Sequence, residues 1–297
     1  MSRRSVDEII NEIREDNKKI MFLYRWLQYN DFVGENCEKL CEFLLDNFNY
    51  FDNIPKDLAY AHEDKKNENG WDYLDYRKDS RQGKPVKGKS DKQFDKTGNH
   101  RRGENYLAMD IFNQCRIKGE KNLKPIDNLG YILDYEMPIG GTKTLLKIKP
   151  GDSYVKTGTS FPYGIPESNE NNEKGLFKPG KCDLIAYSNN CFTILELKKV
   201  NSREPFIRAV LEAYTYKKML DKNRATDSLR EHYKELNIPD FKDIRWKAAP
   251  LLANGENQWK EYYKNGTPNL KKLMEKMEIE PIWYKYSPEN KTITIVR

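Results

Sequence analysis

Asp183, Glu196 and Lys198 are charged residues within a mainly apolar stretch of this chain, CDLIAYSNNCFTILELKK at positions 182–199. The stretch is typical of two short strands joined by Asn189 and Asn190, because asparagine tolerates the positive φ angles of a two-residue hairpin turn. Counting back from this turn places Asp183 opposite Glu196, and a three-residue turn would shift the pairing by one position only. The sequence therefore predicts two carboxylates as near neighbours in one sheet.

This pair of carboxylates carries an electrostatic cost. Residues directly opposed across two strands have Cβ atoms about 5 Å apart, and like charges there destabilise the sheet. At an effective dielectric constant of about 20, Asp183 and Glu196 would repel each other by several kcal/mol. Either one of them binds a proton or a cation lies between them. Hard oxygen ligands suit Mg²⁺ or Mn²⁺, so we predict that both residues bind such an ion.

Lys198 extends the predicted site along the second strand. Side chains alternate along a strand, so Glu196 and Lys198 share one face while Leu195 and Leu197 share the other. The Lys198 ammonium could neutralise a carboxylate, hold an attacking water or bind a phosphate oxygen. A structural Glu–Lys ion pair on an exposed strand is the alternative.

Asp183, followed thirteen positions later by Glu196-Leu197-Lys198 and then by a helix, resembles the motif of the PD-(D/E)XK nuclease superfamily. Cys182 stands where that motif often has proline. The resemblance implies a restriction-endonuclease-like fold and a divalent-metal phosphodiesterase. It also implies that Asp183 and Glu196 are metal ligands, that the Leu197 carbonyl is a third ligand, and that Lys198 positions or activates the water.

The helix after the hairpin adds a second point of similarity. Arg208, Glu212 and Tyr216 recur at spacing i, i+4, i+8 and so share one helix face. Glu212-Ala-Tyr-Thr-Tyr216 is similar to the QxxxY motif of RecB-like nucleases, with glutamate in place of glutamine, which implies a substrate-binding role for this face. A surface charge network between Arg208 and Glu212 is the open alternative.

Glu104 is the remaining candidate ligand. It lies four residues before Ala108, on the inward stripe of a helix predicted from Gly103 to Cys115. Members of the superfamily carry an acidic residue on the helix before the first core strand, which implies that Glu104 joins the metal site. The alternative is a first-turn glutamate that interacts with the helix dipole.

A basic segment precedes this helix. Between Arg77 and Arg102 the chain carries ten lysines and arginines and three aspartates. Glycines and a proline interrupt the run, so it is predicted to be a loop or arm rather than a helix face. Lysine and arginine neutralise backbone phosphates, so we expect this arm to bind DNA without reading its sequence, while a solvated linker is the alternative. Its candidate phosphate-binding residues are Lys87, Lys89, Arg101 and Arg102.

The surrounding pattern predicts an α/β protein with a mixed central sheet flanked by helices. Apolar residues at helical spacing, such as Ile9, Ile10, Ile13 and Ile20, predict an N-terminal helical region over residues 1–75. The arm covers 76–102, and a nuclease-like domain covers 103–297, of which 103–253 carry the resemblance in element order. The elements predicted in that domain are strands at 129–139, 143–149 and 244–253, a helix from about Arg203 to Leu220 with Ser202 as N-cap, a helix at 269–278 and a hairpin at 281–297.

Composition narrows the class of protein. The chain has 297 residues, of which 33% are charged and 12% aromatic, which favours a folded protein with a well-solvated surface. No apolar run approaches the ~18 residues of a membrane span. The start MSRRSVDEII lacks the apolar region of a secretory signal. Five scattered cysteines suit reduced thiols, so we expect a cytoplasmic protein.

We therefore expect a cytoplasmic, Mg²⁺- or Mn²⁺-dependent nuclease that cleaves DNA, with no membrane partner. A non-catalytic nucleic-acid-binding or assembly protein that keeps the nuclease fold is the alternative. A protein-interaction scaffold, in which the N-terminal helices do the binding, is a third hypothesis. RNA as substrate and assembly into a homo-oligomer both stay open.

Overall fold

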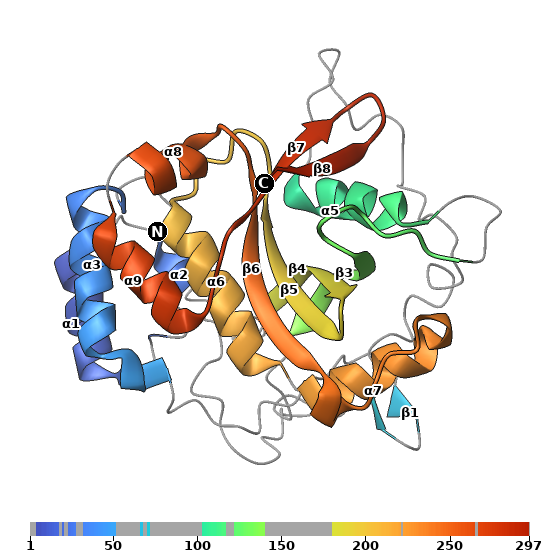
Figure 1. Ribbon diagram of the computed structural model, residues 1–297. Helices are drawn as coiled ribbons and strands as arrows, with labels where there is room; N and C mark the ends of the chain where they lie inside the picture. Colours follow the sequence, from blue (N-terminus) through green and yellow to red (C-terminus); the bar gives the residue numbers. More distant parts are fainter. Residues whose placement is uncertain are drawn as a thin grey trace, which may run out of the picture.

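A mixed six-stranded sheet forms the centre of the computed structural model (Figure 1). The structure describes residues 4–17, 20, 23–27, 32–51, 66–67, 70–71, 103–116, 122–139, 180–220, 222–264 and 267–296. The strands lie side by side in chain order, β3 (Tyr131–Ile139), β4 (Gly180–Ser188), β5 (Cys191–Lys198), β6 (Arg245–Ala253), β7 (Ile282–Ser287) and β8 (Thr292–Val296). The predicted α/β class with a mixed sheet is confirmed.

The type of strand pairing changes twice across this sheet. β3, β4 and β5 pair antiparallel, β5, β6 and β7 pair parallel, and β7 and β8 form an antiparallel hairpin. A separate short ladder joins β1 (Lys66–Asn67) to β2 (Gly70–Trp71). The strand predicted at 143–149 lies outside the described residues.

The turn between β4 and β5 has the predicted form. Asn189 and Asn190 adopt φ angles of 50° and 56°, as a two-residue turn of this hairpin class requires. The strands pair in the expected register as far as Leu184 opposite Leu195. The next residues along the two strands are Asp183 and Glu196, so the turn brings the two carboxylates to the same level of the sheet.

Helices cover both faces of the sheet (Figure 1). α6 (Phe206–Met219) packs on one face, and α5 (Gly103–Gln114) packs on the other. Ile194 belongs to the hydrophobic cluster under α6, whereas Leu195 and Leu197 belong to the cluster under α5. Strand alternation therefore directs Glu196 and Lys198 toward the α6 face.

The N-terminal helices share a core with the sheet. They are α1 (Val6–Glu15), α2 (Leu23–Trp26) and α3 (Glu35–Asp46), followed by the 3₁₀ turn η2 (Phe48–Phe51). The four isoleucines that the periodicity singled out, Ile9, Ile10 and Ile13 of α1 and Ile20 between α1 and α2, join the cluster under α6. Glu38 accepts the backbone N–H groups of Asn269 and Leu270 at 2.9 and 3.4 Å, which caps the start of α9 (Pro268–Met277). The domain boundaries predicted at residues 75 and 102 fall outside the described residues.

The remaining elements connect β5, β6 and β7. α7 (Lys222–His232), η6 (Lys234–Leu236) and η7 (Phe241–Asp243) precede β6, and α8 (Asn257–Lys264) follows it. In the described part of the chain, none of the helices combines the length and the apolar character needed to cross a bilayer.

Candidate active site

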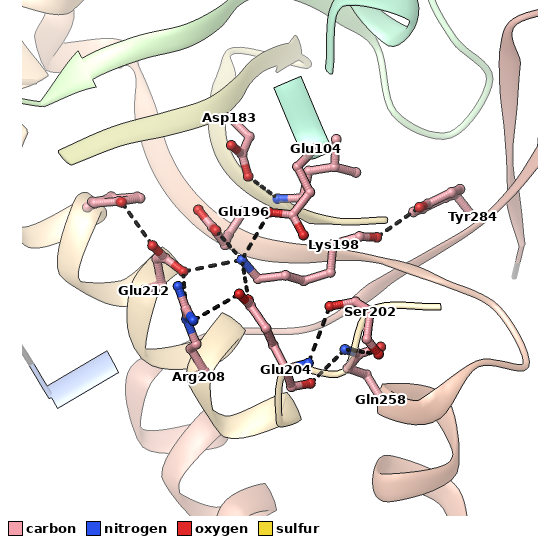
Figure 2. Close-up of polar contacts among 12 residues, drawn as sticks. Glu104, Asp183, Glu196, Lys198, Ser202, Glu204, Arg208, Glu212, Gln258 and Tyr284 are labelled. Atoms are coloured by element: carbon pink, nitrogen blue, oxygen red, sulfur yellow. Dashed lines mark hydrogen bonds and ion pairs between the residues drawn. The ribbon is translucent and has the colours of Figure 1, made fainter. Parts of the chain in front are cut away.

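The ammonium group of Lys198 lies among four carboxylates at the end of β5 (Figure 2). Its Nζ is 2.6 Å from Glu196 Oε1, 3.0 Å from Glu204 Oε2, 3.3 Å from Glu212 Oε2 and 3.7 Å from Glu104 Oε2. The Lys198 side chain is 2% exposed, so the cation depends on these neighbours rather than on water. The carboxylates come from α5, β5, the β5–α6 connection and α6, which meet only in the folded chain.

Asp183 reaches the same region from β4. Its Oδ2 accepts the backbone N–H of Leu197 at 2.7 Å (Figure 2). The ladder between β4 and β5 ends at the Leu184–Leu195 pair, one residue before Asp183. Beyond that pair, the Asp183 carboxylate accepts the backbone amide of β5 in place of a β4 carbonyl. N–H and C=O of one strand residue point toward the same neighbour, so the Leu197 carbonyl is directed to the same edge as Asp183.

Burial and mutual repulsion hold protons on part of this cluster. Burial, with Glu104 and Glu212 nearby, raises the pKa of Asp183 to about 8, although Lys198 and the Leu197 amide oppose the shift. Burial, with Asp183 and Glu212 nearby, also raises the pKa of Glu196 well above its usual range. The predicted repulsion between Asp183 and Glu196 is therefore present in the fold, and protonation is one way to relieve it.

Glu212 is the member of the cluster that stays ionised. Burial alone would raise its pKa, but Lys198 and Arg208, together with hydrogen bonds from Glu196 and Tyr216, lower the pKa of Glu212 to about 2. For Lys198, burial disfavours the charged form, yet Glu196 and Glu212 raise its pKa well above the usual value. Lys198 and Glu212 are therefore in contact as a charged pair, and Glu196 beside them holds a proton more tightly than a free glutamate does.

The residues predicted to bind substrate on α6 lie inside this cluster. The Tyr216 hydroxyl donates to Glu212 Oε1 at 3.0 Å, and the Tyr216 residue is 4% exposed. Arg208 Nη1 is 2.8 Å from Glu204 Oε1, and Arg208 Nε is 3.6 Å from Glu212 Oε2. The charge network between Arg208 and Glu212 is thus part of the site itself, and a direct contact of these residues with DNA stays a prediction.

Glu204 is a site residue that the sequence motif did not reveal. It follows the lysine strand in the polar segment NSRE, where helical or strand periodicity gives no signal. Its position could have been suspected from an acidic residue placed between the ExK strand and a basic helix face. In the structure it joins Lys198 to Arg208 through its two oxygens.

The helix predicted from Arg203 begins later than expected, and the prediction of Ser202 as N-cap is wrong. α6 starts at Phe206 with Pro205 as N-cap, and Ser202 Oγ instead accepts the Glu204 amide at 3.4 Å. Proline disfavours the helical conformation in the residue before it, which excludes Glu204 from the helix. Glu261 of α8 accepts the Phe206 amide at 2.8 Å and so satisfies the first helical N–H group.

α8 holds the β5–α6 connection in place (Figure 2). Gln258 Nε2 donates to the Glu204 carbonyl at 2.7 Å and lies 3.5 Å from the Ser202 carbonyl. Asn257 Nδ2 donates to the same Ser202 carbonyl at 3.1 Å. Gln258 is 1% exposed and far from the motif in sequence, so no sequence signal pointed to it. On the other side, the Tyr284 hydroxyl donates to the Lys198 carbonyl at 2.8 Å.

The donor set of the cluster suits a hard divalent cation. Five carboxyl groups (Glu104, Asp183, Glu196, Glu204 and Glu212) meet two cationic side chains (Lys198 and Arg208). Glu196 is 3% exposed, and its Oε2 has no hydrogen-bond partner among the described residues. No three His, Cys, Asp or Glu side chains in the described ranges converge at metal-ligand spacing. An excess of buried acid with an unsatisfied oxygen nevertheless fits Mg²⁺ or Mn²⁺ in chemical type.

The other predicted features have separate outcomes. Lys87, Lys89, Arg101 and Arg102 of the basic arm lie outside the described residues. All five cysteines are buried and free, as expected for reduced thiols. Comparison of the chain with protein-family models, curated proteins and solved structures finds no match.

Proposed function

We propose that this protein is a Mg²⁺- or Mn²⁺-dependent nuclease that hydrolyses phosphodiester bonds of DNA. The observation that carries the proposal is the contact geometry at the end of β5. Lys198 Nζ is 2.6 Å from Glu196 Oε1, and Asp183 holds the intervening Leu197 amide at 2.7 Å. Two acids and a lysine at these positions, joined by one backbone amide, match the roles that metal-dependent phosphodiester hydrolysis requires.

Each residue has a proposed role. Asp183, Glu196 and the Leu197 carbonyl would hold the cation, with Glu104 as a further ligand. The bound cation supplies Lewis acidity, which lowers the pKa of a water molecule and neutralises charge on the phosphate. Lys198 donates to the attacking water or to a phosphate oxygen and so fixes the direction of attack. Glu212, which stays ionised, keeps the Lys198 ammonium charged and in place.

A catalytic role is favoured over a purely structural one by the energetic cost of the cluster. Burying several carboxylates around one ammonium is less stabilising than packing apolar side chains in the same space, which favours a role that apolar side chains cannot perform. Several strongly shifted pKa values gathered at the end of one strand are typical of catalytic sites. The free thiols support the further proposal that the protein works in the reducing cytoplasm.

Cleavage assays test this function. Purified protein is incubated with single-stranded DNA, duplex DNA and RNA in Mg²⁺, in Mn²⁺ and in EDTA. We expect DNA cleavage with either metal, none in EDTA, and a loss of at least about 100-fold for Asp183→Asn and Lys198→Met. Asp243→Asn serves as a control, because this exposed aspartate lies on η7. Salt-sensitive DNA binding without cleavage in either metal would favour the non-catalytic alternative.

A further inference from the structure

The outer surface of α8 combines aromatic and cationic side chains in adjacent stripes. Gln258 and Tyr262 lie one helical turn apart on the inner side, Trp259 and Tyr263 follow on the next stripe, and Lys260 and Lys264 lie furthest out. Gln258 is buried, Trp259 and Tyr262 are half-buried, and the other three are exposed. The helix therefore presents an aromatic strip edged by lysines.

The aromatic rings form a connected cluster of tilted rings rather than isolated side chains. The Trp259 and Tyr263 centroids are 4.9 Å apart, and Tyr263 packs 5.8 Å from Trp283, which is buried at the base of the cluster. Lys264 Nζ is 5.7 Å from the Trp259 ring, and Lys271 Nζ is 4.9 Å from the Tyr262 ring. Packing from below fixes the rings, so they lose little entropy when a flat ligand stacks on them.

Tyr263 is the most exposed large hydrophobic residue of the described chain, at 54%. A tyrosine that only sealed the core would place its ring inward, as Tyr284 does at 0% exposure. The exposed ring lies on the same helix as the exposed Lys260 and Lys264. Proteins bind single-stranded nucleic acids with this combination, because the bases stack on aromatic rings while the phosphate backbone lies along positive charge.

α8 is joined directly to the candidate active site. Gln258 contacts the Glu204 carbonyl at 2.7 Å, and Glu204 Oε2 lies 3.0 Å from Lys198 Nζ. In the active-site cluster the two cationic side chains, Lys198 and Arg208, are already paired with carboxylates, so the cluster offers a phosphate backbone little free positive charge. A substrate strand must therefore be held by positive charge beside the cluster, and the lysines of α8 supply it within one helix of the site.

We propose that the Trp259–Tyr263 strip, with Lys260 and Lys264, binds unpaired nucleotides of the substrate strand next to the scissile phosphate. The proposal rests on the nuclease function proposed above and narrows its substrate to DNA with a single-stranded segment, such as a free strand or a frayed end. Stacking tolerates all four bases, so the strip gives structural rather than sequence specificity.

Binding without metal separates this proposal from the nuclease function. Affinity for an oligothymidylate of about 16 nucleotides and for a blunt duplex is measured in EDTA by fluorescence anisotropy, where no cleavage is expected. We expect Tyr263→Ala to weaken single-strand binding by roughly fivefold or more, and Tyr263→Phe to retain it. Lys264→Ala should reduce the slope of log affinity against log salt by about 1.

Matched controls lie on another part of the surface. Phe241 is an exposed aromatic residue at 38%, and Lys242 follows it on η7. Phe241→Ala and Lys242→Ala should leave single-strand affinity and its salt slope unchanged. Equal affinities for Tyr263→Ala and Phe241→Ala, or equal effects of Tyr263→Ala on both DNA forms, would overturn the proposal. If the protein cleaves DNA in a metal-dependent way but shows either of these binding results, the role of the strip is refuted and the nuclease function is retained. If the strip binds single strands as expected but no cleavage occurs, the nuclease function is refuted and the binding role of the strip is retained.

Discussion

Lys198 and Glu212 come from different elements, yet their side chains meet at 3.3 Å between Nζ and Oε2. The contact joins β5 to α6 across the face of the sheet on which the acidic cluster is built. Lys198 has a pKa raised well above its usual value, mainly by Glu196 and Glu212 against the effect of burial, and Glu212 has one lowered to about 2. The two residues form the charged pair around which the other carboxyl groups of the cluster are arranged.

Replacing Lys198 should lower the stability of the folded protein. Lys198→Met leaves several buried carboxyl groups without their cation, so we expect the free energy of unfolding to fall by about 3–5 kcal/mol. Urea denaturation measures it, with Lys285→Met as control, because Lys285 is exposed on β7. Equal stabilities of the two variants would show that the cluster does not depend on its ammonium.

Divalent cations should stabilise the wild-type fold. A ligand that binds only the folded state adds about 2.7 kcal/mol at a concentration 100 times its dissociation constant. We expect Mn²⁺ and Mg²⁺ to raise the melting temperature of the wild-type protein but not that of Glu196→Gln, which lacks the ionisable oxygen that has no hydrogen-bond partner. An equal rise in the melting temperature of Glu196→Gln would show that the ions bind at another site.

The pH dependence of stability should include a component from Glu261. Burial raises the pKa of Glu261 to about 7, although the Phe206 amide lowers it. The folded state therefore holds this proton more tightly than the unfolded state. The contribution of Glu261 to the free energy of unfolding is fully present below the unfolded pKa of about 4.3 and is lost as the pH rises to about 7. We expect Glu261→Gln to remove a decline of up to about 1.4 kcal/mol per pH unit.

Denaturation at several pH values in EDTA measures this component. Glu235→Gln provides the control, because Glu235 is an exposed glutamate on η6. If the difference in free energy of unfolding between wild type and Glu261→Gln does not change with pH, then Glu261 has the same pKa in the folded and unfolded states.

Gln258 should affect catalysis through Glu204. Gln258→Leu removes the donor to the Glu204 carbonyl and loosens the β5–α6 connection. We expect about 1–3 kcal/mol of lost stability and a fall in kcat larger than any change in KM, because the loosened acid lies next to Lys198 rather than on the strand-binding surface. Gln258→Asn, with a shorter side chain that keeps an N–H donor, should retain more activity than Gln258→Leu. A change confined to KM would contradict this role.

Local rules were sufficient to predict much of the architecture. The Asn189–Asn190 turn, the register that follows from it and the burial of Ala108 and Ile111 on one stripe are all found. These features depend on residues near one another in sequence, where turn chemistry and periodicity act directly.

Contacts between distant segments were beyond such rules. Glu204 and Gln258 have no periodic or motif signal, and their roles exist only because α8 packs against the β5–α6 connection. The acceptor for the first helical N–H group of α6 was hidden for the same reason, since it is Glu261, 55 residues away in sequence. The mutual contacts of Glu212 and Tyr216 likewise became evident only from their burial.

A crystal of the wild-type protein soaked in Mn²⁺, with anomalous scattering recorded near the manganese edge, shows directly whether the acidic cluster binds a divalent cation. We expect a strong peak between the carboxylates of Asp183 and Glu196, within coordination distance of the Leu197 carbonyl. A fully soaked crystal that shows manganese only at other sites, or none, would contradict it.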